Sequence, residues 1–380
     1  MSDLLRLRPA ATPAMIAVFD DAAVIAHAGA FEVALARAQA AGGLIADEVA
    51  QAIAAGIAAT RIDASELAEE AALAGTLAIP LVARWRAALS GEAAAALHRG
   101  ATSQDVADSV LMRQVVAARD VLAADVARVG AALALHARTH RDMPAMGRTL
   151  LQDALPVGFG LRLAQAAAGI ADAWQDLDAA ITRHAVLQLG GAAGTRSGMD
   201  GRGGAVAEHM AAALGLRAGP PWHARRTGVA AIGAGLGVLI GSLGKFARDV
   251  ALLAQNGIGE AQEPVVAGRG GSSAMAHKRN PTGCQVALSA AIRAPGLVAA
   301  LIAGLPQEQE RGLGGWQAEA PVLADLCLLA AGSAAALAVV AEGLDVDPAA
   351  VARNLDRAGR GVDIGDSVAI IAELLARGED

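Results

Sequence analysis

The chain has 380 residues, of which 54% are hydrophobic, yet only four Phe and four Trp and no Tyr are present. Alanine supplies much of this hydrophobicity, and because alanine favours helices while strand-forming aromatics are scarce, the composition excludes a β-sandwich or β-barrel. The net charge of −7 excludes a basic nucleic-acid-binding protein, and the apolar content excludes intrinsic disorder.

Helical periodicity, interrupted by Gly and Pro, runs along nearly the whole chain. The first half predicts helices over 20–41, 46–58, 64–74, 76–90, 103–141 and 153–188. A Gly-rich loop follows at 190–204. The second half predicts helices over 225–257, 281–303 and 315–342, loops at 258–280 and 304–314, and a short helical tail over 345–380.

Two uncharged runs, 227–244 and 326–341, raise the possibility of membrane spans. Both are at the short limit for crossing about 30 Å of hydrocarbon, and they lack aromatic anchors. Gly233, Gly237 and Gly241 recur every four residues, a spacing that lets helix backbones approach closely. We therefore predict a soluble helical bundle whose Ala- and Gly-rich faces also favour a homo-oligomer.

The most informative loop is 269–281. It carries two adjacent hydroxyls and four basic or titratable side chains: Ser272, Ser273, Arg269, His277, Lys278 and Arg279. Asn280 and Pro281 predict an N-cap and a first helical residue, so an anion here would meet backbone N–H groups and an ammonium together. Lys245 and Lys278 are the only lysines, which hints that position 278 needs an ammonium.

Two further helix starts carry polar side chains: His98, Thr102, Ser103 and Gln104 in one, and Arg148, Thr149 and Gln152 in the other. Helix capping explains part of each pattern. Three polar helix starts in one helical protein predict a shared pole that binds a polyanion. A zinc site at His136 and His140 is disfavoured because no HExxH pattern is present.

The loop sequence GSSAMAHKRNP (271–281) resembles the GSSxMPxKxNP signature of the fumarase/aspartase superfamily. The stretches 97–109 and 147–164 resemble its two other characteristic regions. Within the superfamily, further stretches are similar to the bacterial 3-carboxy-cis,cis-muconate cycloisomerase family: 31–45, 74–82, 190–195 and 315–323.

The resemblance implies an all-α fold with a small N-terminal helical domain (1–95), a central long-helix bundle (96–344) and a short C-terminal helical segment (345–380). It also implies a cytoplasmic homotetramer whose active sites are shared between subunits. The implied ligand is a small polycarboxylate. No metal, organic cofactor, nucleic-acid partner or membrane partner is expected.

Relatives move a proton on a carbon beside a carboxylate through an aci-carboxylate intermediate. The resemblance implies that Ser272 transfers this proton while Lys278 and Asn280 hold the carboxylate. It assigns substrate contacts to His98, Thr102, Ser103, Gln104, Arg148, Thr149, Gln152, Ser273, Met275, His277 and Arg279. The implied reaction is lactonisation of 3-carboxy-cis,cis-muconate.

Two residues depart from the family pattern. Leu150 stands where amino-nucleotide lyases carry a catalytic His, and Ala276 replaces the signature proline. Two alternatives stay open: a lyase that eliminates fumarate or a similar dicarboxylate, and a catalytically silent structural homologue.

Overall fold

The computed structural model describes residues 4–271, 274–275 and 278–376, most of them helical. The helices are α1 (Leu4–Leu7), α2 (Pro13–Val18), α3 (Asp21–Ala41), α4 (Asp47–Ala59), α5 (Ala64–Ala74), α6 (Ala78–Ala87), α7 (Gly91–Ala96), α8 (Ser103–Thr139), α9 (Phe159–His184), α10 (Gly203–Leu214), α11 (Thr227–Leu253), α12 (Thr282–Ala303), α13 (Gly315–Glu342), α14 (Pro348–Ala358) and α15 (Ser367–Ala376). The strands are β1 (Pro144–Thr149), β2 (Gln152–Gly158), β3 (Ala261–Gln262) and β4 (Asp345–Val346), paired antiparallel as β1–β2 and β3–β4. The all-α prediction is confirmed.

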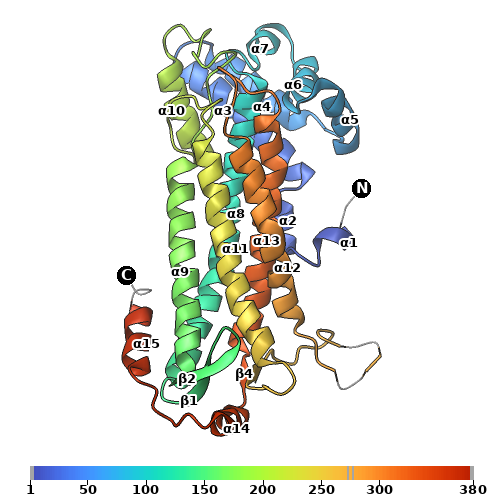
Figure 1. Ribbon diagram of the computed structural model, residues 1–380. Coiled ribbons are helices and arrows are strands. Elements are labelled where there is room, and N and C mark those ends of the chain that lie inside the picture. Colours follow the sequence, from blue (N-terminus) through green and yellow to red (C-terminus); the bar gives the residue numbers. More distant parts are fainter. Residues whose placement is uncertain (1–3, 272–273, 276–277, 377–380) are drawn as a thin grey trace.

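Five long helices, α8, α9, α11, α12 and α13, lie side by side and form the body of the molecule (Figure 1). The 37 residues of α8 make a rod of about 55 Å. The short helices α3 to α7 and α10 gather where α8 begins, which we call the α8 end. The β1–β2 hairpin, α14 and the start of α12 lie at the opposite end, which we call the hairpin end (Figure 1).

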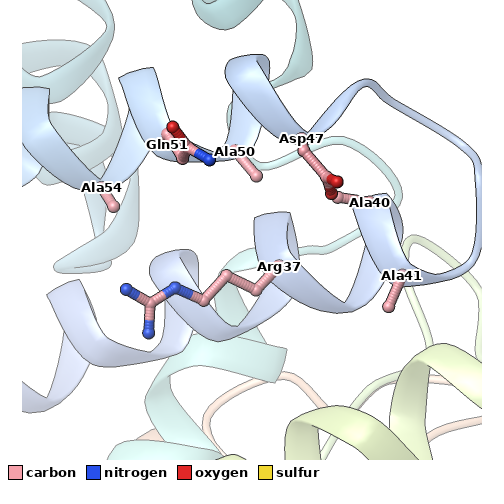
Figure 2. Close-up of a pocket in the computed structure, with 7 residues that line it drawn as sticks. All are labelled: Arg37, Ala40, Ala41, Asp47, Ala50, Gln51 and Ala54. Atoms are coloured by element: carbon pink, nitrogen blue, oxygen red, sulfur yellow. The ribbon is translucent and has the colours of Figure 1, made fainter.

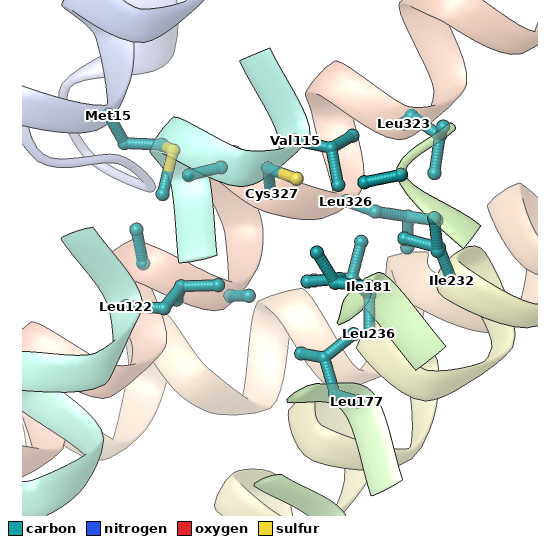
Figure 3. Packing of buried hydrophobic residues seen from close by; sticks show 14 of the residues in the cluster. Met15, Val115, Leu122, Leu177, Ile181, Ile232, Leu236, Leu323, Leu326 and Cys327 are labelled. Atoms are coloured by element: carbon teal, nitrogen blue, oxygen red, sulfur yellow. The ribbon is translucent and has the colours of Figure 1, made fainter. Parts of the chain in front are cut away.

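Small residues allow the bundle helices to pack closely. A Cβ on Gly233 would lie 2.1 Å from Leu301 of α12, and one on Gly237 would lie 2.7 Å from Val298, whereas Gly241 faces open space. Side chains from α2, α8, α9, α11 and α13 fill the interior between them (Figure 3). The predicted close approach therefore holds for two of the three glycines.

Both cysteines are buried and free. Burial raises the pKa of Cys327 to about 12, and the pKa of Cys284 is raised further, first by burial and then by the neighbouring Glu263. Both thiols therefore stay protonated at neutral pH and act as small core residues.

In the described part of the chain, four helical segments are long and apolar enough to cross a membrane by length and composition alone: 13–41, α11, α12 and α13. Most of the apolar stretch of α13 is buried inside the chain, whereas α12 buries only a small part of its own. Ile292 on α12 is 75% exposed, and Ile302 and Val238 are also exposed. Part of the outer surface of α11 and α12 is thus apolar and is not covered by the described residues of the same chain.

The helix predicted over 153–188 begins later than expected. The structure starts α9 at Phe159 and forms the β1–β2 hairpin over 144–158 instead. A helix there would place Pro156 within its first turns, which proline disfavours. In the hairpin the two strands lie so close that a Cβ on Gly147 would be 2.6 Å from the Leu155 carbonyl oxygen, so glycine is required at this position. A second correction is α10, a helix inside a region where none was predicted.

Candidate functional site

The start of α8 is organised by one buried carboxylate. Asp105 accepts hydrogen bonds from the backbone N–H groups of Thr102 (3.0 Å), Gly190 (2.9 Å) and Gly191 (2.8 Å). Its Oδ1 also lies 2.8 Å from Nε2 of the buried His223. Asp105 therefore fixes the Gly-rich loop against the N-terminus of α8.

A second buried network lies one turn further along α8. Arg226 donates two hydrogen bonds to Asp108 (2.7 and 2.8 Å) and others to Glu319 of α13. Its guanidinium carbon stacks 4.5 Å from the centre of the Trp222 ring. Burial, and to a smaller extent the negative charge of Asp108, raises the pKa of Glu319 despite its contact with Arg226. This network joins α8, α11 and α13 beneath the candidate site.

His98 occupies a strained position immediately before α8. Its φ is 64°, in the left-handed region, and its Nδ1 lies 2.6 Å from Oε1 of the buried Glu32 on α3. Burial alone would lower the pKa of His98, but the hydrogen bond and charge of Glu32 outweigh burial, so the pKa is raised. The ring is thus held against α3 and favours its protonated form.

The predicted contact residues at the α8 end divide into two groups. Thr102, Ser103 and His98 remain partly exposed, whereas Gln104 is fully buried. The Nε2 of Gln104 donates to the His223 carbonyl (2.9 Å). Gln104 therefore links α8 to the 185–226 segment inside this chain, and the substrate contact expected of it stays a prediction.

Arg311, in the loop before α13, was missed by the sequence analysis. Its guanidinium donates to Thr102 Oγ1 (3.1 Å) and to the carbonyls of Gly191 (3.2 Å) and Ala192 (3.0 Å). These acceptors are all neutral, and its Nε is buried without a hydrogen-bond partner among the described residues. The α8 end therefore carries a positive charge beside the hydroxyl of Thr102.

Arg148 at the hairpin end is engaged within the chain. Its two terminal nitrogens donate to Glu260 (3.1 and 2.6 Å), and its Nε lies 3.3 Å from Asp153. Glu260 is fully buried, and although burial raises its pKa, Arg148 and Asn354 outweigh burial and lower it. Arg148 thus ties the hairpin to the segment that precedes β3, and the substrate contact expected of it stays a prediction.

The hairpin turn carries the other residues predicted in this segment. Thr149 and Gln152 pair at its base, and Leu150 and Leu151 form the turn with φ values of 51° and 65°. Leu150 is 95% exposed and Leu151 77% exposed. The turn therefore projects two apolar side chains away from the chain that bears them.

The signature loop is described in part. Lys278, Arg279 and Met275 are exposed and Asn280 is partly buried. Three predicted residues, Ser272, Ser273 and His277, lie outside the described residues, as does Ala276.

The predicted helix cap is wrong. The structure places Pro281 at the N-cap of α12, while Asn280 donates from Nδ2 to the Gly271 carbonyl (3.2 Å). The carboxylate of Glu263 accepts from the N–H groups of Gly283 (3.0 Å) and Cys284 (2.6 Å). The helix N-terminus expected to receive a ligand anion is already occupied by a carboxylate of this chain.

The three predicted segments do not meet within one chain. Residues 98–104 lie at the α8 end, whereas the hairpin turn and the start of α12 lie at the hairpin end (Figure 1). No local sequence pattern marks the four residues whose roles were not predicted: Arg311, Glu260, Glu263 and His223. Their roles depend on partners that lie up to 209 residues away along the chain. Among the described residues, no group of three or more His, Cys, Asp or Glu side chains could hold a metal ion.

A groove of about 400 Å³ lies between α3 and α4 (Figure 2). Four alanines form much of its wall, and its polar lining residues are Arg37, Asp47 and Gln51. None of the predicted site residues that the structure describes lines this groove, so it is separate from them.

Comparisons with known proteins give consistent results. A family model described as "Lyase" matches residues 10–296. The chain is 42% identical to a 3-carboxy-cis,cis-muconate cycloisomerase of Pseudomonas putida over 94% of this chain and 86% of that protein. It is 37% identical to a nitrosuccinate lyase of Streptomyces davaonensis, covering all of this chain and 82% of that one.

The solved structures include a similar fold. A crystal structure of 3-carboxy-cis,cis-muconate lactonizing enzyme from Pseudomonas putida superposes with a TM-score of 0.92 and 34% sequence identity, covering 99% of both chains.

Proposed function

The chain belongs to the lyase family whose model matches residues 10–296, and from this membership we propose that it closes 3-carboxy-cis,cis-muconate into a carboxy-muconolactone. One observation carries the proposal: the similarity to cycloisomerases extends over nearly the whole chain in sequence and in fold. The reaction is an intramolecular addition, so no atom except one proton is taken up.

The proposed chemistry needs a proton donor and cations. An oxygen of one substrate carboxylate forms a bond to a diene carbon, and the displaced π electrons move toward the neighbouring carboxylate to give an aci-carboxylate. Ser272 then delivers a proton to the adjacent carbon and recovers one from water. Lys278 neutralises the charge that develops on the aci-carboxylate, which is where a fixed cation lowers the barrier most.

The site is proposed to form between copies of the chain. The Thr102 hydroxyl and the Arg311 guanidinium lie at the α8 end, whereas Lys278 and the hairpin turn lie at the hairpin end. Packing copies against the apolar outer face of α11 and α12 in opposite directions would bring the two ends together. We therefore propose a cytoplasmic homotetramer with shared sites, acting on a small polycarboxylate without metal or cofactor.

The deciding experiment is a direct assay with the purified protein. We expect addition of 3-carboxy-cis,cis-muconate to cause loss of the conjugated-diene absorbance. Ser272→Ala should abolish turnover and leave the oligomer intact, and a retained rate would show that another group carries the proton. If wild type leaves the diene unchanged but releases fumarate from succinyl-amines, the lyase alternative is correct.

A further inference from the structure

The neck of the signature loop is closed by Asn280. Its backbone N–H donates to the Gly270 carbonyl (2.8 Å), and its side-chain amide donates to the Gly271 carbonyl (3.2 Å). Gly270 has a φ of 76°, and a Cβ there would lie 2.8 Å from the Asn280 carbonyl oxygen. The chain that enters the loop and the chain that leaves it are therefore held together at this point.

Glu263 lies beneath this neck and contacts both sides of it. On one side it accepts the hydrogen bonds from Gly283 and Cys284 at the start of α12. On the other, its Oε2 lies 3.9 Å from Nε of Arg269, the residue that opens the loop. Arg269 in turn donates to the Ala336 carbonyl of α13 (3.4 Å). A single buried carboxylate thus connects the loop entrance, the loop exit and the bundle.

The charge of Glu263 matters as much as its reach. A carboxylate at a helix N-terminus is stabilised by the unpaired N–H groups and the helix dipole, and hydrogen bonds to an ionised acceptor are the stronger kind. Because Glu263 takes these donors, a substrate carboxylate cannot use them and must be held by side chains such as Lys278. The position of the loop relative to α12 therefore determines where that ammonium is presented.

We propose that Glu263 is a positioning residue for the lactonisation. It acts through Asn280 and Lys278 by fixing the base of the signature loop on the N-terminus of α12. This inference rests on the proposed function, and it adds a residue that neither the loop motif nor the contact residues include. A misplacement of about 1 Å at a reacting group is enough to cost on the order of 10²-fold in rate.

The test is Glu263→Gln, with Asp63→Asn as the matched control. Asp63 plays the same structural part at the start of α5, where it accepts from the N–H groups of Ser65 (2.9 Å) and Glu66 (3.0 Å), but it is remote from the signature loop. We expect Glu263→Gln to lower kcat by about 10- to 100-fold with KM within about threefold of wild type. Asp63→Asn should leave both constants unchanged, because Asn caps a helix about as well as Asp.

Amide hydrogen exchange supplies a readout that does not depend on turnover. The N–H of Asn280 should exchange faster in Glu263→Gln than in wild type or Asp63→Asn, because the neck that protects it loosens. If Glu263→Gln does not fold, Glu263→Asp keeps the charge, shortens the reach and should show the same pattern to a smaller extent. If either Glu263 variant has a lowered Tm but the exchange rate and kcat of wild type, then Glu263 only caps the helix and the proposal is overturned. If the wild-type protein leaves the diene unchanged, the lactonisation itself is refuted. The exchange comparison then tests only whether Glu263 holds the signature loop in place.

Discussion

At the scale of single residues, the two lysines form a natural comparison. Lys278 is exposed on the signature loop, whereas Lys245 pairs with Asp249 one turn along α11. We expect Lys278→Ala to lower kcat/KM for the diene by at least about 100-fold, because a fixed cation at the developing charge is lost. Lys245→Ala should stay within about twofold of wild type, since exposed ion pairs contribute little. Equal losses in both variants would contradict the role of Lys278.

His98 gives a pH-dependent prediction at the same scale. Because Glu32 raises its folded-state pKa above the ordinary 6.5, the stabilisation from this pair is fully present below about pH 6.5 and is lost as pH rises through the raised value. Urea unfolding of wild type and His98→Gln at fixed protein concentration should show a difference in unfolding free energy that shrinks as the pH is raised above about 6.5. A difference that grows with pH would show the opposite linkage.

The role of a residue could be predicted from the sequence only where its partners lie close to it along the chain. The capped start of α8 at Thr102 followed from its own sequence, and Asp105 completes that cap. The partner of Arg148 did not follow, because Glu260 is 112 residues away and nothing near it in sequence marks it as buried. The carboxylate at the N-terminus of α12 was not predicted for the same reason, because Glu263 contacts Gly283 and Cys284 only through the fold.

At the scale of secondary-structure elements, the long helices followed closely from periodicity. The bounds predicted for α13 are those observed, and those of α8 and α12 differ by at most two residues. The hairpin was missed because its turn lacks the usual Asn-Gly or Gly signal. Leu150 and Leu151 adopt the positive φ values that this turn requires and that leucine disfavours.

This strained turn makes a stability prediction. Replacing Leu150 and Leu151 by Asn-Gly should raise the free energy of unfolding by about 1–2 kcal/mol, because both residues accept positive φ. Calorimetry would show this as a higher Tm. Leu155→Thr removes an exposed leucine from strand β2 without changing a positive φ, so it is the control and should give no comparable rise. A fall in Tm with Asn-Gly would mean that the leucines are buried in the assembly and that their packing outweighs the strain.

At the scale of the whole molecule, separation of the two ends predicts complementation between variants. Thr102→Val, Ser103→Ala and Lys278→Ala should each be nearly inactive alone. Mixed oligomers made by co-expression should recover about a quarter of wild-type activity. Each site takes its two segments from two different copies, and in an equal mixture each segment is intact in about half of the copies. A mixture of Thr102→Val with Ser103→Ala, both at the α8 end, should recover nothing. If neither mixture regains activity, each site lies within a single chain.

The scarcity of lysine has a practical consequence for handling this protein. Only two side-chain amines exist, one on the outer surface of α11 and one on the loop proposed to hold substrate. Apart from a free α-amine, reagents that acylate amines, including common dyes and coupling resins, will therefore attach at one of these two places. In a Lys245→Arg variant, Lys278 is the one side-chain amine that remains. The extent to which Lys278 is labelled can then be compared directly with the turnover that is left.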